Sequence, residues 1–548
     1  MHALLALTLL AAPAAPTTDD PVLRALVDEL GRAKTLKMDT VGAPYYASGS
    51  VTDISGFSVS ASFGAVTHRG HPQETQVHVD TRVGAPDLDS SSFGDGMFSD
   101  MYGRPGGAPD EPDYDALRQA LWLKLDTSYK GAIEALARKR AYLETHASAD
   151  RPADFSAAPV TSVLLPRVKV SVDEERWTKA VKAASAVFRD APGVQSGWAA
   201  FSARAINACF ASTDPVQDRF GDTQVRFDVG ASMQAADGME LEVSVIAVGR
   251  SESDLPKDAA LLQATKEALT RLQALAKAPT LAEDYSGPVL FTGRAADTFF
   301  LRGIALPLSG AHPIVGVPHE GRLTDRLNKH ITSPMLTLRD DPTQKTWKGK
   351  PLLGWYPVDD QGVKPVPLTL VSKGVLQTYF MSRAPTLKVA QSNGHARGST
   401  ATASNLFVEA SEGKSRDALK KQLVQLAKED DQDYGILVDE LYEAGERGYD
   451  MGGESGNVSL PPPVVAYRVY PDGREELIRG ATFKPFSFQS LKDIVAVGKE
   501  PTLLNTQAMG QPVSVVAPAV LVKHLELRKP SREFEKPPLI ARPVVSEK

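Results

Sequence analysis

The spacing of the apolar residues changes near residue 280, and this change limits what the chain can fold into. Before residue 280, segments with apolar side chains three and four positions apart alternate with segments of period two. Helices are predicted at residues 21–36, 114–146, 174–190 and 255–277, and strands at about 49–83, 160–172, 223–230 and 239–249. This mixed order indicates an α+β architecture.

After residue 280, strand-like segments bounded by Gly and Pro dominate the sequence. Strands are predicted at Val289–Phe291, Leu352–Tyr356, Pro367–Leu370, Leu376–Phe380, Val464–Tyr470 and Val513–Leu521, with one helix at about Ser415–Lys428. We therefore expect an α+β chain with an N-terminal domain of helices and antiparallel sheet (15–280) and a mostly antiparallel, barrel-like C-terminal domain (281–529). Residues 530–548 are rich in proline and predict a poorly packed tail.

Charge and cysteine content exclude several classes of protein. The 548 residues carry a net charge of -6 and no long basic run, so we expect no nucleic-acid partner. The single cysteine, Cys209, excludes an intramolecular disulfide and a cysteine-rich zinc site. Its apolar neighbours indicate a buried small hydrophobic residue.

The N-terminus has the pattern of a signal peptide. An apolar stretch from Ala3 to Ala12 is followed by small residues up to Ala15 and then by polar ones, which predicts a signal peptide over residues 1–14. Only the amine and His2 stand where Lys or Arg is usual, and a misassigned start or a buried helix is the alternative. We expect an exported protein, periplasmic or extracellular. No apolar run reaches the ~18 residues that a membrane span needs.

Residues 84–113 are rich in Gly, Pro, Asp and Ser and predict a long exposed loop. Its aspartates, Asp87, Asp89, Asp95 and Asp100, suggest calcium. The EF-hand spacing fails, because Ser92 stands where the turn needs glycine and Phe98 where a bidentate Glu is needed. A solvated acidic loop is the simpler interpretation.

A series of motifs in the second half resembles the TldD/PmbA family of metallopeptidase-like proteins. Residues 287–291 followed by Ala295-Ala296 and a helix-like run to Gly310 are similar to the family's strand, alanine pair and His-Glu-x-x-x-His helix. The resemblance covers about residues 285–525. It continues, in the family's order, through Asp359–Val363, Leu370–Leu376, Ser392–Arg397, Asn405-Leu406 and Glu476–Gly498.

The positions that match the family's zinc site carry other residue types. Leu301 and Leu306 stand for the two histidine ligands, and Arg302 stands for the glutamate base. Leucine has no lone pair for zinc, and arginine neither attracts a divalent cation nor accepts a proton near neutral pH. Where the family has a late cysteine ligand, Ala508–Val513 contains no cysteine. The resemblance therefore implies a metal-free, TldE/PmbA-like member with no catalytic or metal-binding residue, and the reworked segment Met451–Pro463 is a further departure.

Other catalytic or metal sites receive little support from the sequence. His312, His319, Glu320 and His330 are spaced seven and eleven apart and separated by prolines, so solvated loop histidines fit better than a relocated zinc site. The chain has no Gly-x-Ser-x-Gly elbow, phosphate loop or dinucleotide fingerprint.

The candidates for peptide or partner contact are Asn393, Gly394, Arg397 and Asn405. The glycine permits close backbone approach, and Arg397 is suited to a carboxylate or a phosphate. A tight turn that satisfies its own polar groups is an equally good interpretation.

The resemblance implies a non-catalytic subunit or pseudo-peptidase of a zinc metallopeptidase assembly that acts on peptides. Zinc is expected in a partner subunit and no cofactor in this chain; the partner is a zinc-bearing TldD-like subunit or a second copy. Two alternatives stay open: an exported binding or assembly protein that kept the fold without peptidase work, and an active metallopeptidase with unrecognised ligands.

Overall fold

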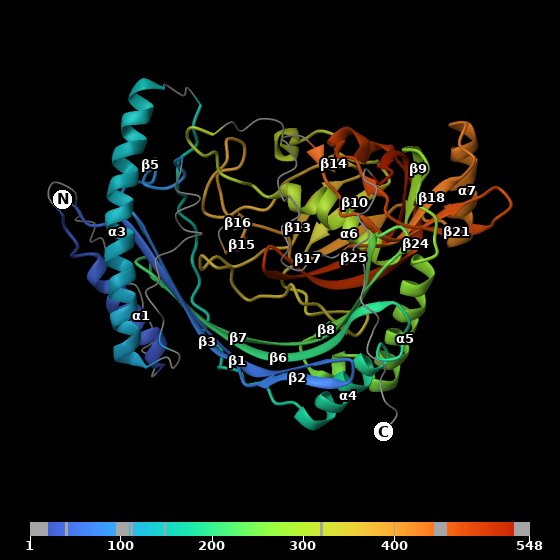
Figure 1. The fold of residues 1–548 in the computed structure, drawn as a ribbon. Helices are drawn as coiled ribbons and strands as arrows, with labels where there is room; N and C mark the ends of the chain where they lie inside the picture. The colour runs from blue at the N-terminus through green and yellow to red at the C-terminus, as the bar shows by residue number, and fades with distance from the viewer. Residues whose placement is uncertain are drawn as a thin grey trace, which may run out of the picture.

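The fold is built on two large sheets, the first from residues 46–249 and the second from residues 285–528. The computed structural model describes residues 20–38, 42–94, 109, 113–146, 150–317, 322–398, 400–442 and 457–530. The predicted signal peptide and almost all of the predicted tail lie outside these residues. The α+β class is confirmed (Figure 1).

The first sheet is antiparallel and has the order β2-β1-β6-β7-β8, with β3 also paired to β1. Its main strands are β1 (Tyr46–Ser62), β2 (Ala65–Gly70), β3 (Gln73–Arg82), β6 (Val194–Ser212), β7 (Gln217–Gln234) and β8 (Glu240–Gly249). The short strands β4 (Gly84–Ala85) and β5 (Leu88–Asp89) pair with each other. Four helices cover one face: α1 (Pro21–Ala33), α3 (Tyr114–Thr145), α4 (Glu174–Ala186) and α5 (Asp258–Leu275).

Buried and exposed side chains alternate along β6, so the helices cover only one face of this sheet. The odd-numbered residues from Ala199 to Ala211 are buried under the helices, whereas the even-numbered ones, including Ser202 and Arg204, are partly or fully exposed. That opposite, more polar face is turned toward the second sheet (Figure 1). The sequence predicted no strand here, because β6 is rich in Ala and Ser, whose apolar signal is weak.

The second sheet has eleven strands, most of them antiparallel, and it does not close into a barrel. Its path is β14-β13-β10-β17-β25-β9-β18-β20-β21, with β22 and β24 also paired to β25. Two pairs are parallel, β17 with β25 and β18 with β9. The strands are β9 (Tyr285–Phe291), β10 (Leu336–Asp340), β13 (Leu368–Ser372), β14 (Val375–Leu376), β17 (Asn405–Ala410), β18 (Gly435–Leu441), β20 (Pro463–Val469), β21 (Glu475–Ile478), β22 (Thr482–Phe483), β24 (Ile494–Ala508) and β25 (Gln511–Arg528).

Helices cover both faces of the centre of this sheet. On β9, Val289 and Phe291 belong to the cluster around α6 (Gly293–Phe300), whereas Leu290 packs against α7 (Arg416–Glu429). A strand buried on both faces needs a continuous apolar run, and the Val-Leu-Phe sequence meets that need. Short pairs lie outside the sheet: β11 (Thr346–Trp347) with β12 (Lys350–Pro351), β15 (Ala396–Arg397) with β16 (Thr400–Ala401), and β19 (Asn457–Val458) with β23 (Phe486–Ser487).

Three local predictions were wrong. Residues 160–172 form only isolated bridges, at Val160 and Leu164. Residues 352–356 contain a turn at 353–354 and no strand. Their backbone carbonyls accept hydrogen bonds from the Arg250 side chain, and a Cβ at Gly354 would lie 2.2 Å from Ser404 O. At 376–380, only Leu376 belongs to a strand, and Phe380 forms an isolated bridge to Ser309.

The acidic loop is also less solvated than predicted. Asp89 is fully buried, where it accepts hydrogen bonds from Tyr45 Oη (2.7 Å) and Arg82 Nη1 (3.1 Å). Asp87 is exposed as predicted. Asp95 and Asp100 lie outside the described residues. The loop composition could not predict that Asp89 is buried, because its burial depends on pairing with Arg82 in the folded chain.

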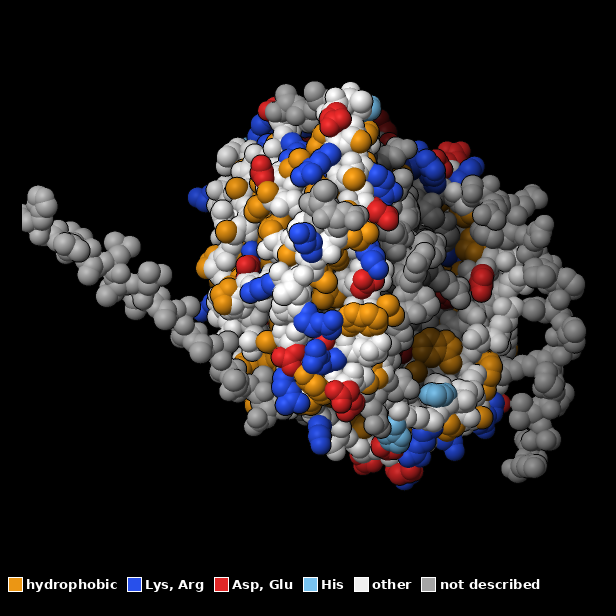
Figure 2. All heavy atoms as spheres, turned by 90° about the vertical axis from the view of Figure 1, so that its left-hand side faces the viewer, with side chains coloured by type: hydrophobic (Ala, Val, Ile, Leu, Met, Phe, Trp, Pro, Cys, Tyr) orange, Lys and Arg blue, Asp and Glu red, His pale blue; other side chains and the backbone are white. Residues whose placement is uncertain are grey.

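The face that α3 presents outward carries basic, acidic and apolar side chains side by side (Figure 2). Trp122 and Leu123 are its large exposed apolar residues, 42% and 45% accessible. Among the described residues, no helix combines the length and apolar character needed to cross a membrane.

Candidate functional site

The helix after β9 forms as predicted, but it changes its winding where the resembling family carries zinc ligands. α6 ends at Phe300 and continues as a π-helical turn, η2 (Leu301–Ala305), and then as a 3-10 turn, η3 (Leu306–Leu308). Leu301 is only 4% exposed, and Leu306 packs against the same core cluster. Arg302 is half-buried.

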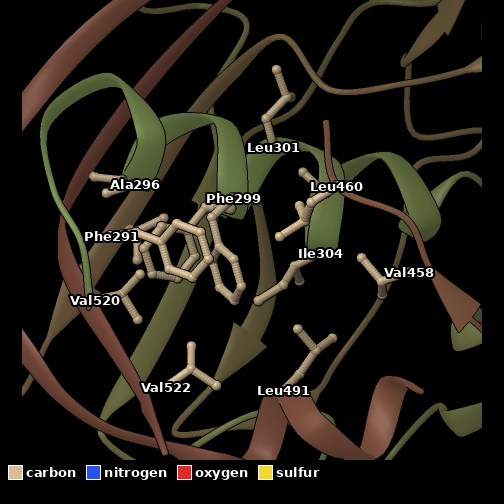
Figure 3. Packing of buried hydrophobic residues seen from close by; sticks show 14 of the residues in the cluster. Phe291, Ala296, Phe299, Leu301, Ile304, Val458, Leu460, Leu491, Val520 and Val522 are labelled. Carbon is tan, nitrogen blue, oxygen red and sulfur yellow. The ribbon is translucent and has the colours of Figure 1, made fainter. Parts of the chain in front are cut away.

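Hydrocarbon side chains fill the surroundings of η2. Ile304 belongs to one cluster with Val458, Leu460 and Leu491, and Figure 3 shows these side chains gathered next to the turn. A Cβ added at Gly303 would lie 3.8 Å from Val458 and 3.9 Å from Leu491. Val458 and Leu460 come from the described end of the reworked segment 451–463. The chain therefore offers no electron-pair donor from these side chains at this place.

The histidines of the alternative zinc hypothesis do not converge in the described residues. His312 Nε2 lies 3.2 Å from Asp154 Oδ1, and its Nδ1 lies 2.6 Å from Pro385 O. The prediction of a solvated loop histidine is wrong for His312, which is buried between two segments, whereas His330 is exposed. His319 and Glu320 lie outside the described residues. Within the described ranges, no three His, Cys, Asp or Glu side chains group as a metal site requires.

Several of the family-like segments meet around Arg397. Arg397 Nη2 donates to Gln511 Oε1 at 2.8 Å, and its guanidinium lies 4.4 Å from the ring centre of Tyr356. Its Nε lies 3.8 Å from Asp360 Oδ1, too far for a hydrogen bond, and has no other partner in the described chain. Tyr356, Asp360, Arg397 and Gln511 are called the Arg397 cluster below.

The backbone holds this cluster together through Asp359. Its Oδ1 accepts hydrogen bonds from the amides of Gln361 (2.9 Å) and Val363 (2.8 Å), and its Oδ2 accepts one from Ala396 N (3.1 Å). Asp360 Oδ2 accepts a further bond from Gly398 N. The loop at 359–363 is thereby joined to β15, which carries Arg397.

The other three candidate contact residues are engaged within the fold. Asn393 accepts from Met381 N and donates to Tyr379 O, both at 2.9 Å. Gly394 has a φ of +74°, and a Cβ there would lie 2.5 Å from Lys364 O. Asn405 is fully buried. It accepts from Gly354 N and donates to two carbonyls, those of Asp341 and Gln344.

The Arg397 cluster faces the first sheet. Arg397 and Arg250 both lower the pKa of Asp222 on β7, but burial is the larger effect and raises it overall. Arg250 pairs with Asp222 and also donates to Leu353 O at 3.1 Å, so it joins the end of β8 to the second sheet. Burial also raises the pKa of Tyr356 well above its usual range.

This arrangement suits recognition of an anionic or polar group better than bond cleavage. Arg397 supplies a positive charge, its buried Nε has no hydrogen-bond partner among the described residues, and the described cluster contains no paired nucleophile and base. The sequence had singled out Arg397 and had noted Asp360 and Gln511 as family-like. It gave no signal for Asp222 or Arg250, because partners on another sheet have no fixed spacing in the chain.

Comparisons with known proteins agree with this architecture. Residues 285–529 match the profile of the PmbA/TldA metallopeptidase C-terminal domain. A 75-residue segment is 35% identical to a protein called metalloprotease from Archaeoglobus fulgidus; it makes up 14% of this chain and spans only 16% of that protein.

Two solved structures share the fold at low sequence identity. TldE from Thermococcus kodakarensis is 12% identical, with a TM-score of 0.54, over 92% of this chain and 100% of that chain. A Bacteroides thetaiotaomicron protein described as a proposed modulator of DNA gyrase is 14% identical, with a TM-score of 0.57, over 93% of this chain and 99% of that chain.

Proposed function

Because the chain belongs to the TldD/PmbA family through its residues 285–529, we propose that it is a non-catalytic subunit of a peptide-cleaving assembly whose zinc is held by a partner. The observation that carries this proposal is the identity and packing of the residues on the helix after β9. Leu301 is in the hydrophobic core and Leu306 packs against it. A zinc ligand at either place would require a polar group in hydrocarbon surroundings.

The residues of peptide contact in this proposal are those of the Arg397 cluster and of the polar face of the first sheet. An extended peptide presents carbonyl groups and a terminal carboxylate, and guanidinium groups bind both. Arg204 on β6 is exposed on the polar face of the first sheet, and Arg397 is half-buried. Pairing of a peptide with an exposed sheet edge is the additional mode expected for such a partner.

The test mixes the purified full-length chain with a zinc-bearing family member from the same organism. We expect metal analysis of this chain alone to give no stoichiometric zinc, size-exclusion chromatography to show association, and peptide cleavage to rise on mixing. Arg397→Glu should reduce that cleavage while association persists. Arg339→Glu is the matched control, because Arg339 forms an exposed pair with Glu409 in the same half of the chain.

Each alternative predicts a different result. Stoichiometric zinc in the isolated chain, with peptidase activity, would favour an active enzyme with other ligands. A monomer that neither associates with the zinc-bearing member nor changes its activity would favour a binding or assembly protein. Self-association without a partner would favour a homo-oligomer.

Export is part of the proposal and has its own measurement. The pattern from Ala3 to Ala15 supports removal of a leader on the way out of the cytoplasm. Cell fractionation followed by N-terminal sequencing of the mature protein tests it. An intact N-terminus in the cytoplasmic fraction contradicts export.

A further inference from the structure

Two buried carboxyl groups lie at the contact between the first sheet and the second. Asp218 lies at the start of β7, and Asp359 begins the loop that holds the Arg397 cluster. Their exposed fractions are 1% and 2%. A Cβ added at Gly362, in the same loop as Asp359, would lie 3.5 Å from Asp218 Oδ2, so the Asp218 carboxyl packs against that loop.

Residues 160–165 contact both Asp218 and the loop that contains Asp359. Thr161 N donates to Gly362 O at 2.9 Å, and Val163 N donates to Asp218 Oδ1 at 2.7 Å. Val160 bridges to Val363. This short segment of the first half therefore lies between β7 and the loop 359–363 and contacts both.

The two carboxyls differ in their hydrogen bonds. Asp359 accepts three backbone N–H groups, an arrangement that favours a charged carboxylate. Asp218 accepts one such bond, and its Oδ2 is buried without a hydrogen-bond partner among the described residues. A buried charged oxygen with no donor is costly, whereas a hydroxyl there is neutral. The proton of the pair therefore belongs on Asp218 Oδ2.

Neither Asp218 nor Asp359 forms an ion pair within the described residues. Arg383, whose backbone N donates to Gln361 Oε1 in the loop, pairs with Asp214. Arg219, the neighbour of Asp218 on β7, pairs with Asp20. On the loop, Asp360 adds a second negative charge, which lies near Arg397. Residues 160–165 carry no titratable side chain, and the β6 residue opposite Asp218 is Phe210. Asp222, further along β7, pairs with Arg250.

We propose that Asp218 is a pH switch at the contact between the two sheets. Its neutral carboxyl can be buried against the loop 359–363, whereas loss of its proton places an unpaired charge there and loosens the contact. The inference concerns regulation of the contact and does not rest on the proposed function. A loosened loop would also displace Arg397, because Asp359 Oδ2 binds Ala396 N next to it.

The direction of the pH dependence follows from the pKa values. Burial, with a smaller contribution from the charge of Asp359, raises the pKa of Asp218 from 3.8 to about 7, although the hydrogen bond from Val163 N opposes the shift. Burial also raises the pKa of Asp359 to about 7, although its three N–H bonds lower it. A group whose pKa is raised by folding stabilises the closed state fully below about pH 4, and that stabilisation is lost as the pH rises to about 7.

Amide hydrogen exchange of the full-length protein at pH 5 and pH 8, corrected for intrinsic rates, tests whether the contact between β7 and the loop 359–363 loosens as the pH rises. We expect protection of residues 160–165 and 359–363 to fall by at least ~10-fold between these pH values, a shift of one pKa unit or more. Asp218→Asn keeps the shape of the neutral acid and should reduce the pH-dependent loss to the part that belongs to Asp359. Asp493→Asn, which removes an exposed carboxyl from the second half, should leave it unchanged.

A second measurement covers the case in which Asp218→Asn folds poorly. Infrared difference spectra of the wild-type protein should contain the carbonyl stretch of a protonated carboxylic acid that disappears as the pH rises through about 7. Absence of that band at pH 5 to 6, or equal protection at both pH values in the wild type, overturns the proposal. An unchanged pH dependence in a folded Asp218→Asn protein overturns it as well.

Discussion

At the scale of single residues, the protein buries a pair of charged side chains. Lys139 and Asp154 are both fully buried and lie 2.7 Å apart (Nζ to Oδ2). Lys139 also donates to the carbonyls of Asp89 and Ser91. Asp154 additionally contacts His312 from the second half. Burial lowers the pKa of Lys139, and its bond to Asp154 opposes that effect.

Removal of one member of this pair should be severe. Lys139→Met leaves the Asp154 carboxylate buried with fewer partners, so we expect the free energy of unfolding to fall by about 3–5 kcal/mol. Urea unfolding followed by circular dichroism measures it. Lys130→Met, on the same helix but in an exposed pair with Asp126, should cost no more than about 0.5 kcal/mol. Equal effects of the two variants would contradict the assignment.

At the scale of elements, the helix after β9 is a core element and not a surface on which a metal could be rebuilt. Its π-helical turn places Leu301 in the main cluster of the second sheet. We expect Leu301→Ala to cost about 2–5 kcal/mol, because the cavity adds to the lost transfer energy. Leu387→Ala, at a side chain that is 59% exposed, should change stability by less than about 0.5 kcal/mol. Thermal denaturation of both variants distinguishes them.

Two glycines have nearly the same positive φ but different surroundings, so substitutions at them can distinguish backbone strain from a steric clash. Gly394 has φ +74° and faces Lys364 O, whereas Gly510, in the β24–β25 hairpin, has φ +75° and no atom within 4 Å of an added Cβ. Gly510→Ala should therefore cost only the backbone term of about 1 kcal/mol. Gly394→Ala should cost clearly more, because Lys364 O would lie 2.5 Å from the new Cβ. Chemical unfolding of both variants measures their free energies of unfolding. Similar losses in the two variants would contradict this prediction.

At the scale of the whole molecule, Arg383 makes several of the contacts that join the two halves of the chain. Arg383, only 4% exposed, pairs with Asp214 at 2.8 Å, donates to Ser156 O at 3.1 Å and stacks 4.2 Å from the ring centre of Phe155. These three partners belong to the first half, and Arg383 belongs to the second. Cooperative unfolding of the molecule depends on such contacts.

Arg383→Met should weaken this connection. We expect a loss of about 2–3 kcal/mol, the range for hydrogen bonds to a charged group, and a split of the calorimetric transition into two. Arg339→Met, which removes an exposed ion pair within the second sheet, should keep a single transition. A single, equally shifted transition in both variants would show that Arg383 does not couple the halves.

The sequence by itself determined the elements whose apolar residues repeat strongly. The stripe of α3 and the Val-Leu-Phe run of β9 needed no tertiary information, because a helical stripe indicates one buried face and a continuous apolar run indicates a strand buried on both faces. It also determined that Leu301, Arg302 and Leu306 cannot act as zinc ligands and base, since that is a property of the residue types.

Only the tertiary structure decided which groups meet. Arg397 and Gln511 are 114 residues apart, and Asp218 meets the Asp359 loop across two sheets. β6 became a strand through its neighbours β1 and β7, although its small residues carry little pattern of their own. The physical reason is the same in each case. Periodicity records which face of an element is apolar, whereas pairing, burial of charge and the state of a proton depend on partners that the chain brings together only when it folds.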